Sequence, residues 1–356
     1  MNRLILIGNG SDLAHKLKTS YCDFIKYYIS KSLNALDKQD SFEDPLLKIA
    51  PHYNNFKLQM CADSIPETAL RDLNTLKTHG YFTVEIKSKL LSDTLDRAAS
   101  VNWVDLENDY FEQLVALKDP RGFNFEGVKA LNDEFDYLKT QLQKYLITLE
   151  RDSKSLFHFD YRDLFCEPIN GNEIVEKGSI ESEPKKILIL NFNYTKTLEK
   201  YKDACPREYG VEINYIHGQL ESEVNPIIFG FGDEFNQQYK DFEGLRNNEL
   251  LRHIKSFAYF KTSNYHNLMR FIDADDFQVY IFGHSLGLSD RTMLRQIFEH
   301  RTCISIKIFY HKIDKEHDDY RNKTFDISSH FTNKATMRLK IVPYNLCVPM
   351  PQIAPK

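Results

Sequence analysis

The sequence lacks the long apolar runs that would place it in or across a membrane. No stretch approaches the ~18 consecutive apolar residues of a membrane-spanning helix. The apolar run at residues 4–7 ends at Gly8, which makes it too short for the core of a signal peptide. We therefore expect a cytoplasmic protein without a membrane partner. Internal repeats and low-complexity tracts are also missing.

Closely spaced cysteines and an excess of basic residues are missing as well. The six cysteines stand at positions 22, 61, 166, 205, 303 and 347, and no two have the spacing of a metal-binding finger. They predict reduced cytosolic thiols and no metal site. Because 46 Lys and Arg face 51 Asp and Glu, the net charge is −5, and bulk electrostatics does not indicate nucleic acid as a partner.

What is present is a globular composition and a distinctive start. Hydrophobic residues make up 42% of the 356 residues and charged residues 27%, as in soluble globular proteins. At ~150 residues per domain, this length allows two domains or one elaborated domain. The run at residues 4–7 is followed by a glycine-containing turn and a helical pattern, which predicts a buried parallel strand, a tight turn and a helix start.

The turn after this strand, Gly8-Asn9-Gly10-Ser11-Asp12, has the outline of a phosphate-binding loop. Glycine allows a ligand to approach the backbone, and a helix start presents N–H groups to an anion. The alternative is a turn that binds nothing. A dinucleotide-binding fingerprint would have a third glycine where this chain has Leu13. It would also have an acidic residue at the end of a second strand about twenty residues further on, and none is found there. Both departures disfavour an ordinary nicotinamide dehydrogenase.

The middle of the chain has a different pattern. From residue 22 to about 180 the periodicity is that of long helices, including one amphipathic helix between Val128 and Leu149. Short β-rich runs then return at 187–190, 213–216, 227–229, 279–282 and 304–310, each ending in a loop. The sequence predicts an α/β protein with a discontinuous core (1–21 and 181–356) and a helical insertion domain (22–180). Ligands of parallel sheets bind beyond the carboxyl ends of the strands, so these loops are expected to share one crevice.

Two of the later loops carry candidate catalytic residues. Asn193 follows the strand at 187–190, and Thr195 leads on toward a helix; the alternative role of either is to cap that helix. His217 ends the run at 213–216 and precedes Gly218. A histidine at a strand end can act as a general base near neutral pH, although such a histidine can also be structural.

The loop Gly283-His284-Ser285-Leu286-Gly287 matches the G-x-S-x-G pattern of a hydrolase nucleophile elbow and predicts a Ser285 esterase as one alternative. Only about seventy residues remain after it for the acid and the histidine that should follow in that order. The competing interpretation is that Gly283, Ser285 and backbone N–H groups hold a ribose or a phosphate.

A metal-dependent nuclease is a further alternative. Its candidates are Asp105 and Glu107 after Trp103, the histidine and acidic cluster at 311–319, and the E-x-K pattern at 85–87. The cluster has no regular spacing and includes lysines, which favours a solvated loop over a metal site.

The motifs at 8–15, 19–21, 191–195, 216–218 and 282–286, taken together, resemble the AbiH family of bacterial phage abortive-infection proteins. The order of the motifs and the long helical insertion agree with this family over about residues 1 to 300. Two positions depart from it, because the family usually has an aromatic residue at Ser11 and often a glycine at Lys16.

At greater distance the same motifs are similar to the sirtuin-like NAD-binding superfamily, which implies a Rossmann-like parallel sheet and NAD as ligand. Asp12 stands where that group has a serine, and Thr195 where it has an acid. The four zinc cysteines of sirtuin deacetylases are absent, so a deacylase is not expected. The NAD-binding residues that this resemblance implies are Gly8, Asn9, Gly10, Asp12, Thr195, Gly218, Gly283, His284 and Ser285.

The resulting expectation is an antiphage effector that hydrolyses NAD at the nicotinamide–ribose bond, an NAD glycohydrolase. Asn193 would orient the ribose or the water, and His217 would act as the base. The alternatives are a sensor or toxin component that binds a nucleotide without turnover, the metal-dependent nuclease and the Ser285 esterase. An activator from phage or host and a homo-oligomer remain open as further partners.

Overall fold

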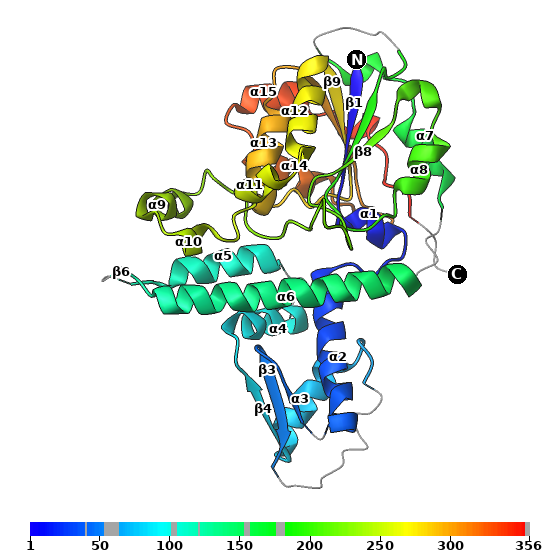
Figure 1. Cartoon of the computed structure of the whole chain (residues 1–356). Coiled ribbons are helices and arrows are strands. Elements are labelled where there is room, and N and C mark those ends of the chain that lie inside the picture. Colours follow the sequence, from blue (N-terminus) through cyan, green and yellow to red (C-terminus); the bar gives the residue numbers. More distant parts are fainter. Residues whose placement is uncertain are drawn as a thin grey trace. The chain divides into compact units, whose positions relative to one another are not determined.

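The computed structural model describes residues 1–39, 41–52, 64–100, 105–119, 122–152, 157–175 and 182–352 (Figure 1). The chain folds into two compact units. The first comprises Met1–Leu17, Leu149–Lys240 and Ile254–Lys356, and the second Lys18–Thr148 and Asp241–His253. The segment Asp241–His253 therefore leaves the first unit, packs in the second and returns.

The first unit is built on a five-stranded parallel sheet, which confirms the predicted α/β class. Its strands are β1 (Asn2–Ile7), β7 (Ile187–Asn191), β8 (Glu212–Tyr215), β9 (Phe277–Phe282) and β10 (Cys303–Phe309). They lie in the order β10-β9-β1-β7-β8, and every neighbouring pair is parallel. Counted along the chain, this order is 3-2-1-4-5, that of doubly wound nucleotide-binding sheets, and the winding reverses between β1 and β9.

The central strands consist mainly of apolar residues because both faces of the sheet are covered. From β1, Leu4 and Leu6 enter one buried cluster, whereas Ile5 and Ile7 enter another. The first cluster packs with α12 (Asn264–Ala274), α13 (Arg291–Phe298) and α14 (Tyr320–Ser329), and the second with α7 (Phe159–Phe165) and α8 (Glu199–Ala204). Figure 1 shows α12 and α13 on the opposite side of the sheet from α7 and α8.

One predicted strand is wrong. The apolar run at 227–229 forms no strand, because the chain doubles back directly after β8. Gly218 (φ +83) lies so close to the returning segment that a Cβ there would be 2.2 Å from the Pro226 carbonyl oxygen. The Ile228 N–H then donates to the His217 carbonyl at 2.7 Å, so this segment pairs with the loop beyond β8 instead of extending the sheet.

A buried ionic network covers the α7 face of the sheet. Lys307 of β10 pairs with Glu167 and Glu173, each at 2.8 Å, and Arg3 of β1 stacks on the Tyr280 ring with its guanidinium 4.2 Å from the ring centroid. Arg3 also donates to the Glu167 carbonyl at 2.6 Å. These contacts hold the segment after α7 on the sheet, although the predicted insertion extended to residue 180.

The second unit contains helices α2 (Tyr21–Gln39), α3 (Ala69–His79), α4 (Lys89–Ser100) and α5 (Leu106–Ala116) and most of α6 (Phe125–Asp152). The apolar stripe predicted for the helix between Val128 and Leu149 lies on α6, where its residues from Val128 to Leu146 are buried. The unit also holds β strands that the helical prediction missed. An antiparallel sheet joins β2 (Phe42–Glu43), β3 (Leu47–Pro51) and β4 (Phe82–Ile86), and β5 (Lys118–Asp119) pairs with β6 (Gly122–Phe123).

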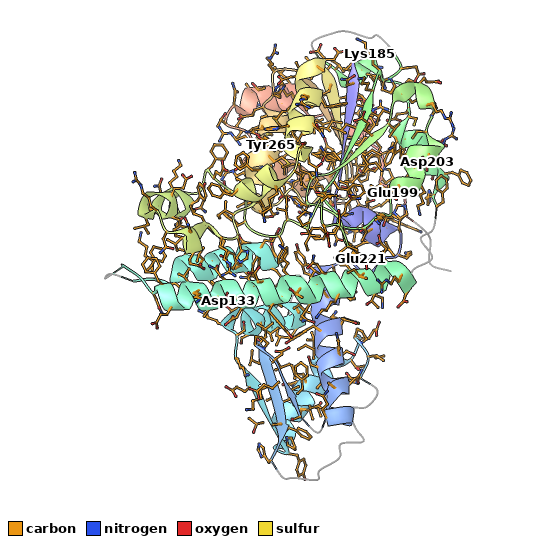
Figure 2. The ribbon with its side chains drawn as sticks, in the orientation of Figure 1. Asp133, Lys185, Glu199, Asp203, Glu221 and Tyr265 are labelled. Atoms are coloured by element: carbon orange, nitrogen blue, oxygen red, sulfur yellow. The ribbon has the colours of Figure 1, made fainter. Side chains whose placement is uncertain are left out.

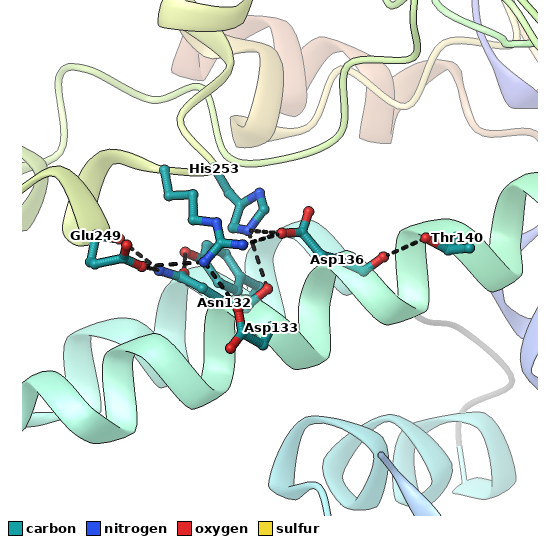
Figure 3. Close-up of polar contacts among 8 residues, drawn as sticks. Asn132, Asp133, Asp136, Thr140, Glu249 and His253 are labelled. Atoms are coloured by element: carbon teal, nitrogen blue, oxygen red, sulfur yellow. Dashed lines mark hydrogen bonds and ion pairs between the residues drawn. The ribbon is translucent and has the colours of Figure 1, made fainter. Parts of the chain in front are cut away.

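Charged groups bind the returning segment to α6 (Figure 3). It includes part of α9 (Gln237–Leu245) and all of α10 (Asn248–Leu251). Asn132 of α6 donates to both the carbonyl and the carboxylate of Glu249 at 2.8 Å. Arg252 forms ion pairs of 2.7 to 3.3 Å with three carboxylates, those of Asp133, Asp136 and Glu249.

Candidate functional site

The loops that follow β1, β7 and β9 meet at the carboxyl edge of the sheet. The Gly8 N–H donates to the Phe282 carbonyl at 3.1 Å, and the Gly10 N–H donates to the Gly283 carbonyl at 2.8 Å. Asn193 Nδ2 donates to the Gly8 carbonyl at 3.1 Å. The structure therefore brings these sequence-predicted residues together where the winding of the sheet reverses.

Contact between two loops explains the glycines at this edge. A Cβ at Gly8 would lie 2.5 Å from His284 Cα, and a Cβ at Gly10 would lie 2.8 Å from Gly283 Cα. Gly283 has φ +64, and its Cβ would lie 2.2 Å from the Ser11 nitrogen. Only glycine permits such approaches. The space that a phosphate would need beside these residues is filled by the loop after β9.

The first turn of α1 (Asn9–Ala14) uses its N–H groups within the protein. The Gly10 N–H is bonded to Gly283, and the Ser11 N–H donates to the Gly8 carbonyl at 2.9 Å. Asn9, the remaining predicted residue of the turn, is half-buried. A phosphate could reach the Gly10 and Ser11 N–H groups only after the loop contacts had changed.

Asp12 turns inward toward the loop after β7. Its carboxylate is buried, and Oδ2 accepts a hydrogen bond of 2.7 Å from the Thr195 hydroxyl. Oδ1 has no hydrogen-bond partner. Burial raises the pKa of Asp12 to about 6, although hydrogen bonds from Thr195 and Thr197 oppose the rise. The carboxylate that replaces the expected serine therefore fills a protein interior position.

The raised pKa of Asp12 predicts a pH-dependent loss of stability. Its folded-state pKa of about 6 exceeds the ordinary value of 3.8, so the folded protein holds the proton more tightly than the unfolded chain. Proton binding by Asp12 therefore stabilises the folded protein. This stabilisation is fully present below pH 3.8 and is lost as pH rises through 6. Asp12→Asn is therefore expected to gain ~1–3 kcal/mol over the wild type at pH 7.

Urea unfolding of the wild type and Asp12→Asn between pH 4.5 and 7.5 measures this difference. The advantage of the variant should grow across that interval, while Asp160→Asn, at an exposed carboxylate, should follow the wild type. An advantage that does not change with pH would contradict the assigned protonation.

A buried cluster of His217, Asp290 and Lys255 lies beyond β8. Asp290 Oδ1 accepts a hydrogen bond of 2.8 Å from Lys255 Nζ and lies 3.1 Å from His217 Nε2. The Tyr259 hydroxyl is 3.3 Å from the same imidazole nitrogen. Lys255 is only 1% exposed. His284 Nε2 lies 3.7 Å from Asp290 Oδ2, so one carboxylate faces three basic groups away from solvent.

The charges within this cluster determine the state of the imidazole. Burial, together with the positive charge of Lys255, lowers the pKa of His217. Burial alone would raise the pKa of Asp290, but Lys255 and His217 hold it well below its usual range. His217 is therefore neutral beside an ionised pair, the state required of a general base. A backbone hydrogen bond with Phe192 opposes the lowering of the His217 pKa.

Two histidines hold the loop after β9 in a strained conformation. Leu286 has φ +62, a region that side chains larger than glycine rarely adopt. Its N–H donates to His284 Nδ1 and its carbonyl accepts from His330 Nε2, both at 2.9 Å. Burial lowers the pKa of His284 to about 3. His284 therefore acts in this structure as a neutral acceptor that fixes the loop.

Ser285 does not have the geometry of a nucleophile elbow. The strained residue is Leu286, whereas an elbow places its serine at the sharp turn. The exposed Ser285 hydroxyl accepts from the Gly287 N–H at 3.4 Å, and a 3-10 turn at Leu288–Asp290 separates it from α13. No hydrogen bond joins Ser285 to a histidine in the described part of the chain.

The nuclease candidates do not converge on a metal site. Among the described residues, no group of three or more His, Cys, Asp or Glu side chains is placed to hold a metal ion. Asp105 caps α5 by accepting the Asn108 N–H at 3.2 Å, and Lys87 pairs with Glu43 at 2.6 Å. In the 311–319 cluster, exposed Asp314 and His317 pair at 2.9 Å. Trp103 lies outside the described residues.

Sequence reasoning missed Lys255 and Asp290. Lys255 belongs to no sequence motif. In the structure its backbone N–H donates to the Phe231 carbonyl at 2.9 Å, which holds the residue in the interior. Asp290 had one available signal, its position directly before α13, where an acidic residue favours a helix start.

The described helices include none that is long and apolar enough to cross a bilayer. Comparison of the chain with curated proteins and with solved structures finds no match in either set. The family described as "Bacteriophage abortive infection AbiH" matches residues 4–312, from β1 through the end of β10. Lys16, where that family often has glycine, has φ +65, the conformation that glycine adopts readily. The chain belongs to the AbiH family of bacteriophage abortive-infection proteins.

Proposed function

We propose that this AbiH protein is a cytoplasmic antiphage effector that binds NAD or a related nucleotide and hydrolyses the nicotinamide–ribose bond on a sirtuin-like Rossmann sheet. The observation that carries the proposal is the His217–Asp290 pair, 3.1 Å apart, at the carboxyl edge of a doubly wound parallel sheet. Nucleotides bind such sheets beyond the carboxyl ends of the strands, near the reversal of the strand order.

The proposed chemistry assigns one role to each residue. Neutral His217 accepts the proton of the attacking water, and Asp290 stabilises the imidazolium that forms. Asn193, whose side-chain amide already contacts the Gly8 carbonyl, orients the ribose or the water. Positioning supplies much of the rate, because nicotinamide leaves as a neutral group from a cationic ring.

The proposal requires the loop at 283–287 to have a closed and an open form. The N–H groups of Gly10 and Ser11 are bonded within the protein, and the loop at 283–287 occupies the space beside them. Nucleotide binding then requires this loop to move. Its strained residue, Leu286, supports movement there, because release of the loop relieves an unfavourable backbone conformation. An activator from phage or host would act by favouring the open loop.

Release of nicotinamide from NAD tests the proposal. The purified chain is incubated with NAD, alone and with a lysate of phage-infected cells, and nicotinamide is quantified by chromatography. We expect turnover by the wild type and a loss of ~10²-fold or more in His217→Ala, since a general base contributes 10²–10⁴-fold. Asn193→Ala should lose activity as well, whereas His266→Ala, at an exposed histidine of α12, should retain it.

Circular dichroism must show that these variants are folded. Equal inactivity of the wild type and both site variants under every condition would overturn the proposal. Turnover that His217→Ala retains at the wild-type rate would also overturn the role assigned to His217.

A nucleotide-binding module without chemistry is the second candidate. It is favoured by one observation, that His217 Nε2 is already in contact with Asp290 at 3.1 Å and with the Tyr259 hydroxyl at 3.3 Å. Calorimetric binding of NAD without release of nicotinamide, under conditions in which the lysate has been supplied, would select this candidate.

A further inference from the structure

Two cysteine side chains far apart in sequence meet beside the sheet. Cys166 directly follows α7, and Cys205 directly follows α8. Figure 2 labels Asp203 in the last turn of α8, two residues before Cys205. The two sulfur atoms are 2.8 Å apart, less than ~1 Å beyond the length of a disulfide bond. Both are free thiols, as are the buried Cys22, Cys303 and Cys347.

The surroundings make the two thiols chemically unequal. The Cys166 S–H donates to the Cys205 sulfur, and this hydrogen bond lowers the pKa of Cys205, with a contribution from Arg162. The same hydrogen bond, together with burial, raises the pKa of Cys166. Arg162 is held near Cys205 because its Nε donates to the Ala204 carbonyl at 3.0 Å. Cys205 therefore forms the thiolate more readily, and the half-buried Cys166 supplies the second thiol.

We propose that Cys166 and Cys205 are a reversible redox pair that a hydroperoxide such as hydrogen peroxide oxidises to a disulfide. The Cys205 thiolate attacks one peroxide oxygen, the O–O bond breaks, and the other oxygen leaves as water after taking a proton. The Cys166 sulfur then attacks the resulting sulfenic acid, the S–S bond forms, and hydroxide leaves as water with the Cys166 proton. Two thiols and one peroxide give one disulfide and two waters.

The bridge would constrain a functional part of the first unit. The loop that it closes spans 39 residue positions and contains β7 with the loop that carries Asn193 and Thr195. On α8, the Tyr201 hydroxyl bonds His15 Nε2 at 2.6 Å, at the end of α1. Oxidation would therefore tie α8 to α7 beside the glycine loops. This inference stands independently of NAD hydrolysis.

Peptide mapping of the full-length protein tests the pair. The reduced chain is treated with hydrogen peroxide, remaining thiols are alkylated, and the protein is digested with trypsin. We expect the peptides 163–177 and 203–207 to be joined in the oxidised wild type and to separate after dithiothreitol. The link should be absent from Cys166→Ser and Cys205→Ser and present in Cys303→Ser. Oxidation should also raise the melting temperature of the wild type by several degrees and leave Cys166→Ser unchanged.

The intermediate provides a second, independent readout. In Cys166→Ser, dimedone should trap a sulfenic acid on Cys205, and Cys205→Ala replaces Cys205→Ser if the latter fails to fold. Thiols that remain free after peroxide, separate sulfinic acids without a link, or a link to Cys22, Cys303 or Cys347 would overturn the proposal.

Discussion

Asp290→Asn is expected to destabilise the folded protein by about 3–5 kcal/mol, the usual cost of removing one partner of a buried ion pair. Asp290 accepts from Lys255 at 2.8 Å and lies 3.1 Å from His217, and Lys255 is 1% exposed. An amide cannot balance the ammonium, so the variant buries a positive charge beside a neutral group. Urea unfolding at pH 7, followed by circular dichroism, measures the loss.

A second variant separates the charge effect from a packing effect. Lys255→Met in combination with Asp290→Asn removes the unbalanced ammonium, so the double variant should be more stable than Asp290→Asn alone. Asp314→Asn, at an exposed aspartate, should change the free energy of unfolding by less than ~0.5 kcal/mol. If Asp290→Asn had wild-type stability, the cluster would not contain the ionised pair described above.

Gly283→Ala is expected to cost about 3 kcal/mol, because a strained backbone conformation and a steric overlap act together. The residue has φ +64, and the new Cβ would lie 2.2 Å from the Ser11 nitrogen and 2.6 Å from the Gly10 carbonyl carbon. Both are backbone atoms, which cannot move aside as the end of a flexible side chain can. The free energy of unfolding in urea is again the measurement.

Two other glycines provide matched controls. Gly80 has φ +67 but nothing within 4 Å of an added Cβ, so Gly80→Ala shows the backbone cost alone, ~1 kcal/mol. Gly244 lies in α9 with equally open space, and Gly244→Ala should be neutral or slightly stabilising. A loss in Gly283→Ala no larger than that in Gly80→Ala would refute the loop-packing explanation of the glycines.

The strands of the parallel sheet could be predicted from the sequence because their local pattern is compatible with few other structures. Short runs rich in apolar and β-branched residues that end in a loop predict strands, so β1, β7, β8, β9 and β10 could be found without a structure. The run at 227–229 has the same composition but follows the tight turn at Gly218, and tertiary pairing with the loop at His217 prevents it from joining the sheet. Of the strands missed in the second unit, β2, β5 and β6 are only two residues long, too short for a period of alternation to show.

The site could be predicted only in part, for two physical reasons. Glycines that admit a ligand and glycines that admit a neighbouring loop satisfy the same steric requirement, so Gly8 and Gly10 alone do not distinguish the two. Charged residues in irregular segments are usually solvated. Lys255 and Asp290 are buried only because each supplies the other's counterion, a relation between residues 35 positions apart that no local pattern shows.

The position of β1 at the centre of the sheet affects how the protein is made. Its partners are β7, where Arg3 pairs with Ile187, and β9, where Asn2 pairs with Phe277. At 5–20 residues per second, the ribosome needs roughly 10–40 s after making β1 before it has made β7. During that time β1 has no partner strand, while Lys18–Thr148, the larger part of the second unit, has already been synthesised. Folding of the sheet is therefore a late event in synthesis, because β1 can pair only after β7 and β9 have been made.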